Sequence, residues 1–377
     1  MPRYAHVIGW GMALPDQVLT NEELAQKVDT SSEWIIARTG IHERRIAGKN
    51  ETTASLALRA ASQALERTSL DPRQVQLIIV ATSSPEHLFP ATACLVQDRL
   101  GARSAGAFDL SAACTGFIYA LNMAAQAIRS GSLDNAIVIG AETLSRIVDW
   151  EDRSTCILFG DGAGAFVLQA SEKPGGVLSC VMRSDGSGGD LLILPAGGSR
   201  MPATHETVQR RLHTIHMNGR EVFRFAAKAM VSATREAVAR AGLDLQEIEL
   251  VVPHQANLRI LENAARSLRL PPDRFFVNIE HYGNTSTASI PIAVCEAVKG
   301  GRVSPGDHLV LVGFGAGLTW GALTLQWVAQ EQAVSTGRRF HRRILAWLAR
   351  LSSFLRRIWL HLEGLIWGTS SGGGPEE

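Results

Sequence analysis

VQLIIVATSS (residues 75–84) decides the fold, because its run of apolar, largely β-branched residues is typical of a strand buried on both faces. IELVVPHQAN (residues 248–257) repeats this pattern later in the chain. A second pair, NAIVIGAETL (135–144) and DHLVLVGFGAGL (307–318), has the same character. Helical patterns separate these runs, so we predict an α/β protein with largely buried sheets.

The two halves of the sequence repeat each other in order and spacing. Cys114 lies 24 residues before Val138, in the first half. Asn284 lies 26 residues before Val310, in the second. We interpret this as an internal duplication that creates a cleft between halves; the alternative is a chance likeness between two ordinary βαβ units. The predicted units are a first half, a second half and a C-terminal extension: residues 1–174, 175–330 and 331–377.

The composition is that of a globular protein with 377 residues, 46% hydrophobic content and a net charge of +1. Its five cysteines are odd in number and scattered, without a CxxC pair or a His cluster at metal-ligand spacing. We therefore expect a reducing compartment and no metal. The N-terminal MPRYAHVIGWGMALP has no basic segment followed by an apolar run, so we expect no signal peptide, a cytoplasmic location and no nucleic-acid partner.

Cys114 is the candidate nucleophile, in FDLSAACTGFIYALNMAAQAIRSG (residues 108–131). The pattern predicts a short strand, a small-residue turn and a helix that ends near Gly131. A thiol at a helix N-terminus should have a pKa below its free value of roughly 8.5, because the helix dipole stabilises the thiolate. The alternative is a small buried packing residue. The other four cysteines lack this context and are expected to serve packing: Cys94, Cys156, Cys180 and Cys295.

His254 and Asn284 are two further candidates. His254 follows an apolar strand in VVPHQANLRI, and the carboxyl ends of strands present side chains to ligands in open α/β folds. Its alternative is a structural histidine held by its own loop. Asn284 lies in EHYGNTSTASIPIAV, at a Gly-Asn turn before a helix that its side chain would cap. The repeat places Cys114 and Asn284 at equivalent positions, so we predict all three residues in one cleft.

Two glycine-rich segments also follow or precede predicted strands. GFGAGLTWG (313–321) lacks the GxGxxG spacing and acidic partner of a nucleotide site, so we interpret it as a close backbone approach to a reacting group. DGAGA (161–165) is a tight turn into the next strand, rather than a phosphate site.

Seven segments, taken in order, closely resemble 3-oxoacyl-[acyl-carrier-protein] synthase III, the initiating condensing enzyme of the thiolase-like superfamily. They are SSEWIIARTGIHERRIA, FPATAC, the Cys114 helix, DRSTCILFGDGAGA, VPHQANLRI, HYGNTSTASIP and GFGAGLTWG. The resemblance runs from residue 1 to about 329. It implies a thiolase-like duplicated fold, with two βαβαβαββ halves in a layered α-β-α-β-α core, and a homodimer that initiates fatty acid chains.

The resemblance also implies a reaction. Cys114 accepts an acyl group from an acyl-CoA, commonly acetyl-CoA, and releases CoA. Malonyl-acyl-carrier-protein then loses CO₂, while His254 and Asn284 donate to the thioester oxygen of the enolate. The backbone N–H groups of Cys114 and Ala316 hold the oxyanion formed when the carbanion attacks; the family often has glycine at the position of Ala316. No cofactor is implied. A related starter-unit synthase for longer or branched acyl-CoA keeps the same three residues.

Binding residues follow from the same resemblance. The implied CoA site comprises Thr30, Trp34, Arg38, Arg153, Gly219, Phe223 and Asn257. Trp34 and Arg153 would sandwich the adenine, because aromatic and guanidinium groups both stack on purines. Phe314 and Phe89 would shape the acyl pocket, with Phe89 reaching into the partner subunit. The residues implied to meet the acidic acyl carrier protein are Arg224, Arg259 and Arg266. By their local context alone, Trp34 is a core aromatic and the arginines are solvated charges.

Rival functions are weaker on the same residues. A thiolase needs a second cysteine near the glycine-rich loop, and GFGAG has none. Elongating ketoacyl synthases use two histidines, where this chain has His254 and Asn284. A silent scaffold or membrane-tethered binding protein is suggested only by the C-terminal extension.

Residues 338–370 extend beyond the family's usual end and carry an amphipathic pattern. Residues 338–377 hold seven arginines against three glutamates. On a helix, one face is apolar: Phe340, Ile344, Trp347, Leu348, Leu351, Phe354, Leu355, Ile358, Leu362 and Leu365. The opposite face and its flanks are basic: Arg338, Arg339, Arg342, Arg343, Arg350, Arg356 and Arg357. We predict peripheral contact with an anionic membrane through 338–367. The alternatives are docking onto the body or another subunit, and a poorly ordered extension.

Overall fold

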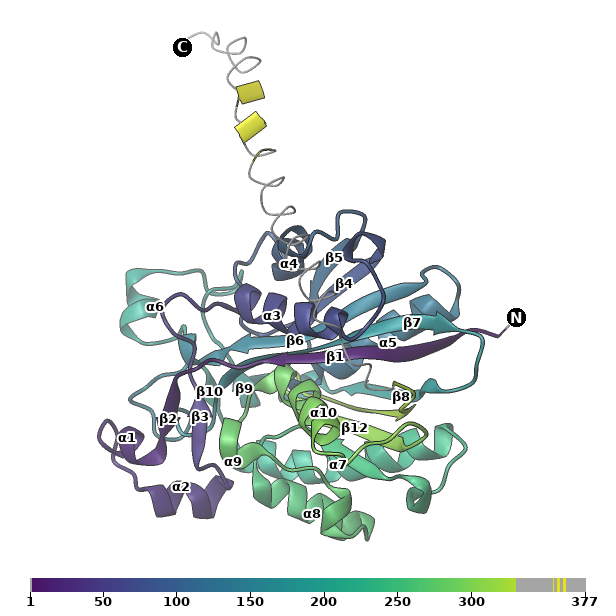
Figure 1. Cartoon of the computed structure of the whole chain (residues 1–377). Helices are drawn as coiled ribbons and strands as arrows, with labels where there is room; N and C mark the ends of the chain where they lie inside the picture. The colour runs from purple at the N-terminus through teal and green to yellow at the C-terminus, as the bar shows by residue number, and fades with distance from the viewer. Residues whose placement is uncertain (1, 330–354, 356–357, 360–361, 364–377) are drawn as a thin grey trace.

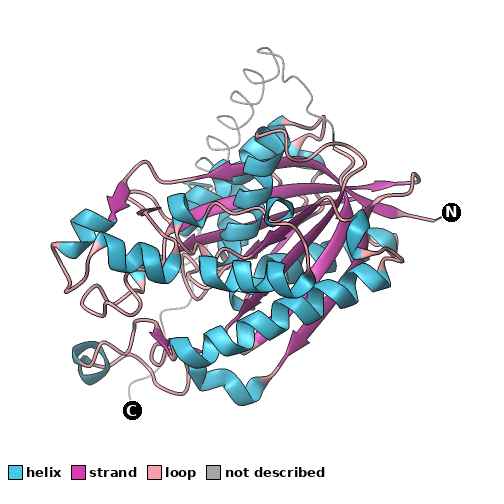
Figure 2. Ribbon diagram, turned by 90° about the horizontal axis from the view of Figure 1, so that it is seen from below, coloured by secondary structure: helices cyan, strands magenta, loops and turns pink. Residues whose placement is uncertain are grey.

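The computed structural model describes residues 2–329, 355, 358–359 and 362–363. Two sheets lie one above the other in these residues, with helices between them and on both outer faces (Figures 1 and 2). Helices α3 and α4 cover the first sheet, α5 and α10 lie between the sheets, and α7 and α8 cover the second. The bounds of these helices are Thr53–Glu66, Thr92–Leu100, Gly116–Arg129, Ser289–Lys299, Gly219–Arg240 and Leu258–Leu268.

The first sheet has five strands in the order β1-β7-β6-β4-β5. Strand β4 runs parallel to β5 and β6, whereas β7 runs antiparallel to β6 and β1. Every residue of β6 is buried, which explains its uninterrupted apolar pattern. In chain order the strands are β1 (Tyr4–Ala13), β4 (Leu77–Ala81), β5 (Gly106–Leu110), β6 (Asn135–Thr143) and β7 (Asp161–Ser171).

The second sheet repeats this order with four strands, β8-β13-β12-β11 matching β1-β7-β6-β4. The counterpart of β5 is reduced to a single parallel bridge between Val251 and Phe275. The predicted α/β class and the duplicated, layered core are therefore confirmed. The strands are β8 (Gly176–Ser184), β11 (Leu250–Pro253), β12 (His308–Gly315) and β13 (Thr319–Gln326).

Smaller elements surround the core. A two-stranded sheet and two short helices form a flap near the N-terminus: β2 (Val18–Thr20), β3 (Glu43–Arg45), α1 (Asn21–Ala25) and α2 (Ser32–Thr39). A second small sheet and a short helix follow β8: β9 (Leu192–Ile193), β10 (His216–Met217) and α6 (His205–Gln209). Helix α9 spans Ile279–Tyr282, and two 3₁₀ turns precede the central helices: η2 (Ala113–Thr115) and η7 (Ser286–Ala288).

The structure corrects one detail of the repeat. Turn η2 leads into α5, and η7 leads into α10, so these turns are equivalent. Each begins with a non-glycine residue at positive φ, Ala113 at 46° and Ser286 at 48°. Cys114 is therefore matched by Thr287, and Asn284 lies three residues earlier. The spacing in sequence misplaced the match because α5 has 14 residues and α10 has 11.

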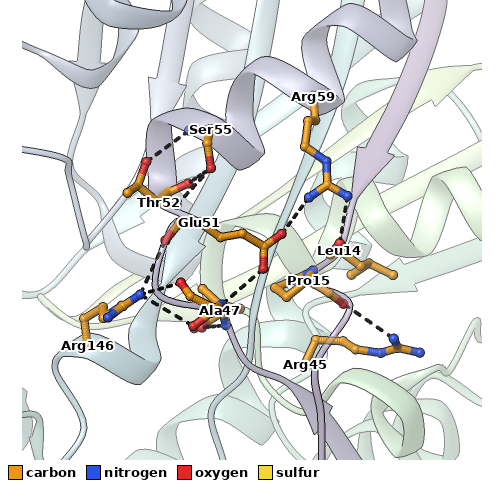
Figure 3. Close-up of polar contacts among 11 residues, drawn as sticks. Leu14, Pro15, Arg45, Ala47, Glu51, Thr52, Ser55, Arg59 and Arg146 are labelled. Atoms are coloured by element: carbon orange, nitrogen blue, oxygen red, sulfur yellow. Dashed lines mark hydrogen bonds and ion pairs between the residues drawn. The ribbon is translucent and has the colours of Figure 1, made fainter.

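A hydrogen-bonded loop fixes the flap to the first half (Figure 3). Arg146 donates to the carbonyl oxygens of Gly48 and Glu51, at 2.8 and 3.4 Å. The Glu51 carboxylate pairs with Arg59 at 2.7 Å, and Arg59 also donates to the carbonyl of Leu14 at 3.1 Å. The connection from β3 to α3 is thus held at several points, and it anchors the flap that carries Trp34.

Most of the predicted amphipathic helix at 338–367 lies outside the described residues. The positions of this segment that are described are helical, and Leu355, Ile358 and Leu362 are exposed. Within the described part of the chain, none of the helices combines the length and apolar character needed to cross a bilayer.

Candidate active site

A cavity of about 550 Å³ opens between the two halves and the flap. Its floor contains Cys114, His254, Asn284 and Phe314, and its walls include Trp34, Arg38, Gly219, Phe223, Asn257 and Arg259. The structure thus brings the three predicted chemical side chains into one cavity. A cavity of this volume and mixed lining is typical of small-molecule and cofactor sites.

Cys114 lies in η2, directly before the N-terminus of α5, as the sequence predicted. A Cβ built on Gly315 would approach the Cys114 nitrogen to 2.7 Å, so glycine at that position permits the loop to reach the nucleophile. This is the close backbone approach predicted for the glycine-rich segment.

The predicted direction of the Cys114 pKa shift is wrong. Burial raises the pKa of the thiol to about 12, and the carboxylate of Glu142 raises it further. The hydrogen bond from Ser286 opposes both effects without overcoming them. Desolvation outweighs the helix terminus because the side chain is almost completely enclosed. Cys114 is therefore a thiol at rest, and its proton must leave during acylation.

His254 follows the last residue of β11, and its backbone N–H donates to the carbonyl of Val312 at 2.7 Å. Its Nδ1 lies 2.7 Å from the Oγ of Ser289, the first residue of α10. Ser289 Oγ also accepts the backbone N–H of Gln255 at 3.4 Å, so its own hydrogen is free for Nδ1. Burial lowers the pKa of His254 to about 3. A neutral imidazole with the proton on Nε2 follows, and Nε2 is the ring nitrogen left for a ligand.

Asn284 is held by a local hydrogen bond rather than capping a helix end directly. Its Oδ1 accepts the backbone N–H of Ser286 at 2.8 Å, which fixes the orientation of the amide. The Nδ2 group then remains as the donor toward the cavity that Asn284 lines. His254 and Asn284 both present N–H groups, a pair suited to stabilising negative charge on one oxygen atom.

The residues predicted to bind CoA surround the cavity mouth. Trp34, Arg38, Gly219, Phe223 and Asn257 line it, whereas Thr30 and Arg153 flank it. The guanidinium groups of Arg38 and Arg153 already lie over the Trp34 ring, at 5.0 and 5.3 Å from its centroid. An adenine between Trp34 and Arg153 therefore requires Arg153 to move.

Two of these residues differ in what their polar atoms do. Asn257 uses its side chain to donate to the Arg38 carbonyl at 3.0 Å and to accept from the N–H of Arg259, so it joins the flap to α8. The Oγ1 of Thr30 is buried with no hydrogen-bond partner among the described residues. Thr30 thus keeps a free donor beside the mouth.

The acyl-pocket predictions separate in space. Phe314 is buried on the cavity floor and packs edge-on against the His254 ring, with centroids 5.5 Å apart. Phe89 is 86% exposed on the loop before α4 and does not line the cavity of its own chain. Ala316 follows β12, and its carbonyl accepts from Thr319 Oγ1 at 3.0 Å, while the neighbouring Gly315 lines the cavity.

The three arginines predicted to meet the carrier protein lie on α7 and α8. Arg259 lines the cavity and lies 5.9 Å from the centroid of the Phe223 ring. Arg224 pairs with Glu221 at 3.2 Å, and Arg266 donates to Asn263 at 2.5 Å. All three are exposed, and Arg259 marks where this basic surface reaches the cavity mouth.

Sequence reasoning missed two polar groups that adjoin the nucleophile. Glu142, at the end of β6, is completely buried, and Ser286 hydrogen-bonds to both Cys114 and Glu142. The available signal was an acidic residue within NAIVIGAETL, an otherwise apolar strand pattern. A charge in such a position is rarely placed there for packing.

A duplicated α-β-α-β-α core with Cys, His and Asn in one cavity defines a condensing enzyme of the thiolase-like class. Models of 3-oxoacyl-[acyl-carrier-protein] synthase III match residues 108–186, and the C-terminal model of that family matches residues 238–327. A beta-ketoacyl-[acyl-carrier-protein] synthase III of Symbiobacterium thermophilum is 54% identical over 85% of this chain and 97% of its own.

Other relatives agree. The synthase III of Roseiflexus sp. (strain RS-1) is 50% identical over 87% of this chain and 100% of its own. The crystal structure of 3-oxoacyl-[acyl-carrier-protein] synthase III from Aquifex aeolicus superposes with a TM-score of 0.79 at 49% identity, covering 86% of this chain and 100% of that one. This chain belongs to the beta-ketoacyl-[acyl-carrier-protein] synthase III family of acyltransferases, and its role is in fatty acid synthesis.

Proposed function

We propose that this enzyme transfers an acyl group, most simply acetyl, from an acyl-CoA to Cys114 and condenses it with malonyl-acyl-carrier-protein to give 3-oxoacyl-acyl-carrier-protein, CoA and CO₂. One observation carries the proposal: a thiol and two oriented N–H donors, Cys114, His254 and Asn284, line the same cavity. No cofactor is needed, because both substrates are activated as thioesters.

In the first half-reaction, the Cys114 sulfur attacks the thioester carbonyl and CoA leaves. The oxyanion is held by the backbone N–H groups of Cys114 and Ala316, and losing one such donor costs about 10²- to 10³-fold in rate. The CoA nucleotide lies at the mouth against Trp34, with Arg38 and Arg153 meeting its base and phosphates. This assignment is supported by the ring contacts of these arginines with Trp34.

In the second half-reaction, the malonyl carboxylate leaves as CO₂, and the remaining electron pair forms an enolate. His254 Nε2–H and Asn284 Nδ2–H donate to the enolate oxygen, and the carbanion attacks the acyl carbonyl on Cys114. The fixed amide of Asn284 and the Ser289 contact of His254 support these roles, because preorganised donors need no rearrangement when charge develops.

The carrier protein docks on the basic surface formed by Arg224, Arg259 and Arg266, beside the cavity mouth. An acidic partner would meet this surface first by long-range attraction, so these charges should mainly affect the association rate. Arg259 is the central residue of this proposal, because it alone of the three also lines the cavity.

The active unit is a homodimer. Strand β5 is the edge of the five-stranded sheet and exposes Phe108, and the loop before α4 exposes Leu88 and Phe89 by 83% and 86%. An unpaired edge strand with apolar side chains is a template for pairing with a second chain. In such a dimer, Phe89 would enter the acyl pocket of the partner and limit chain length.

The enzyme works in the cytoplasm, and its extension contacts membranes. All five cysteines are free, as expected in a reducing compartment. The opposed apolar and arginine faces of 338–367 fit an anionic surface, and the described Leu355, Ile358 and Leu362 are exposed. Truncation at residue 335 should abolish sedimentation with anionic vesicles and leave catalysis intact; unchanged sedimentation contradicts this role. The linker between β7 and β8 separates the halves, 1–174 and 175–330, from the extension 331–377.

Intact-protein mass spectrometry tests the reaction. The enzyme is mixed with acetyl-CoA, in parallel with a Cys114→Ala variant, and malonyl-acyl-carrier-protein is then added. An acetyl adduct that requires Cys114 and disappears with formation of product supports the proposal. An adduct only with a longer or branched acyl-CoA moves the enzyme to a starter-unit synthase, and no adduct with any acyl-CoA overturns it.

A further inference from the structure

Glu142 is a buried carboxylate whose partners are amides and hydroxyls. Its oxygens accept the backbone N–H groups of Ser83 and Ser84, at 3.1 Å each, and the Ser84 hydroxyl at 2.6 Å. Burial raises the pKa of Glu142, so its neutral form is more accessible than that of an exposed carboxylate. Placing a titratable group in the interior is costly, and function is one reason to retain it.

Ser286 connects this carboxylate to the nucleophile. Its side chain is hydrogen-bonded to the Cys114 thiol on one side and to Glu142 on the other. Ser286 is 3% exposed and has a φ of 48°, a left-handed conformation that costs free energy for a non-glycine residue. Its backbone N–H is separately engaged by Asn284 at 2.8 Å. The hydroxyl therefore lies between a donor thiol and an acceptor carboxylate.

Thr287 gives Glu142 two protonation states that are both satisfied. The Thr287 hydroxyl lies 3.0 Å from Glu142 Oε1 and 2.9 Å from the carbonyl oxygen of Ala81. Both of these atoms are acceptors when Glu142 is ionised, and one hydroxyl has only one hydrogen to donate. If Glu142 carries a proton on Oε1, it donates to Thr287, and Thr287 donates to Ala81. The contacts therefore include a place for an additional proton.

The resting thiol needs such an acceptor. Cys114 is protonated at rest, and its sulfur becomes a good nucleophile only as the proton leaves. His254 is poorly placed to take it, because Ser289 occupies Nδ1 and Nε2 then carries a hydrogen. Within the described residues that line or adjoin this floor, Glu142 is the remaining titratable group in hydrogen-bond connection with Cys114.

We propose that Glu142 accepts the Cys114 proton through the Ser286 hydroxyl during acylation. The inference rests on the acylation proposed above. The thiol hydrogen moves to Ser286 Oγ as the Ser286 hydrogen moves to Glu142, and the sulfur forms a bond to the acyl carbon. The bond between that carbon and the CoA sulfur then breaks. The departing CoA thiolate takes the proton back along the same path, so Glu142 ends ionised and no proton is gained or lost.

The test separates the two half-reactions in Ser286→Ala. This variant removes the hydroxyl but keeps the backbone N–H that orients Asn284. The rate of acetyl-Cys114 formation is followed by rapid quenching and intact mass, and CO₂ release from malonyl-acyl-carrier-protein is followed in enzyme that has already been acylated. Thr82→Val is the matched control, because Thr82 gives Glu142 another hydroxyl, at 3.3 Å, that lies off the proposed path. Glu142→Gln provides a second block.

We expect Ser286→Ala and Glu142→Gln to slow acylation about 10²-fold or more, the usual effect of losing general base assistance. CO₂ release by pre-acylated Ser286→Ala should stay within about twofold, and its acylation rate should rise steadily with pH, because hydroxide replaces the relay. Thr82→Val should acylate normally. If Ser286→Ala acylates at the normal rate, or loses both half-reactions equally, the relay is refuted. If the unmodified enzyme forms no adduct, the proposed function fails, and the relay fails with it.

Discussion

Replacing Ser289 by alanine should damage condensation while sparing acylation. Ser289 Oγ lies 2.7 Å from His254 Nδ1, and both residues are buried. Without the serine hydroxyl, Nδ1 has no donor and the tautomer with the proton on Nδ1 becomes accessible. In that tautomer Nε2 is an acceptor, so it repels the enolate oxygen that it must stabilise.

The size of the effect follows from the bond that is lost. A buried polar group left without its partner costs about 1–3 kcal/mol, which corresponds to about a 5- to 150-fold change in an equilibrium. We therefore expect CO₂ release and product formation to fall by this factor. Acylation of Cys114 does not use the Nε2 donor, so its rate should change less than about twofold.

Single-turnover measurements of the two half-reactions test this. The control is Thr234→Val, because the Thr234 hydroxyl is buried on α7 with no hydrogen-bond partner among the described residues. Its removal should leave both rates unchanged. Equal loss of both half-reactions in Ser289→Ala, or no loss of either, would refute the role assigned to the serine hydroxyl.

Three further predictions follow from named contacts. Gly140→Ala should destabilise the protein by about 2 kcal/mol or more, since the added Cβ would lie 2.2 Å from the Thr287 carbonyl oxygen; thermal unfolding checks this, with Gly186→Ala, where nothing lies within 4 Å, as control. Trp34→Ala should raise KM for acyl-CoA about tenfold and leave kcat nearly unchanged, because it removes a surface for the nucleotide; an unaltered KM contradicts the assignment. Because burial lowers the pKa of His254 to about 3, condensation by acylated enzyme should lack an acid limb near pH 6.5. The unfolded histidine binds a proton below about pH 6.5, so this residue should make stability fall as pH falls from there toward 3, and a pH titration of unfolding checks the direction.

Much of the fold and of the site could be read from the sequence because each depends on local patterns. The runs at 77–81, 135–143, 250–253 and 308–315 are strands, and each was visible as a continuous apolar segment. Cys114 and His254 were found because each follows such a segment at a turn. Asn284 was found by the repeat, although its true position is three residues before the equivalent of Cys114.

Tertiary structure alone decided the electrostatics and the second layer of contacts. The helix N-terminus beside Cys114 suggested a lowered pKa, but enclosure by both halves raises it to about 12. No local pattern relates Glu142 to Cys114, or Ser289 to His254, because these contacts join segments that are far apart in the chain. The sequence by itself determined which strands form and which residues carry chemistry, since hydrophobic periodicity and turn chemistry are local. Protonation states, tautomers and donor directions depend on how completely distant segments exclude water, and only the folded arrangement determines that.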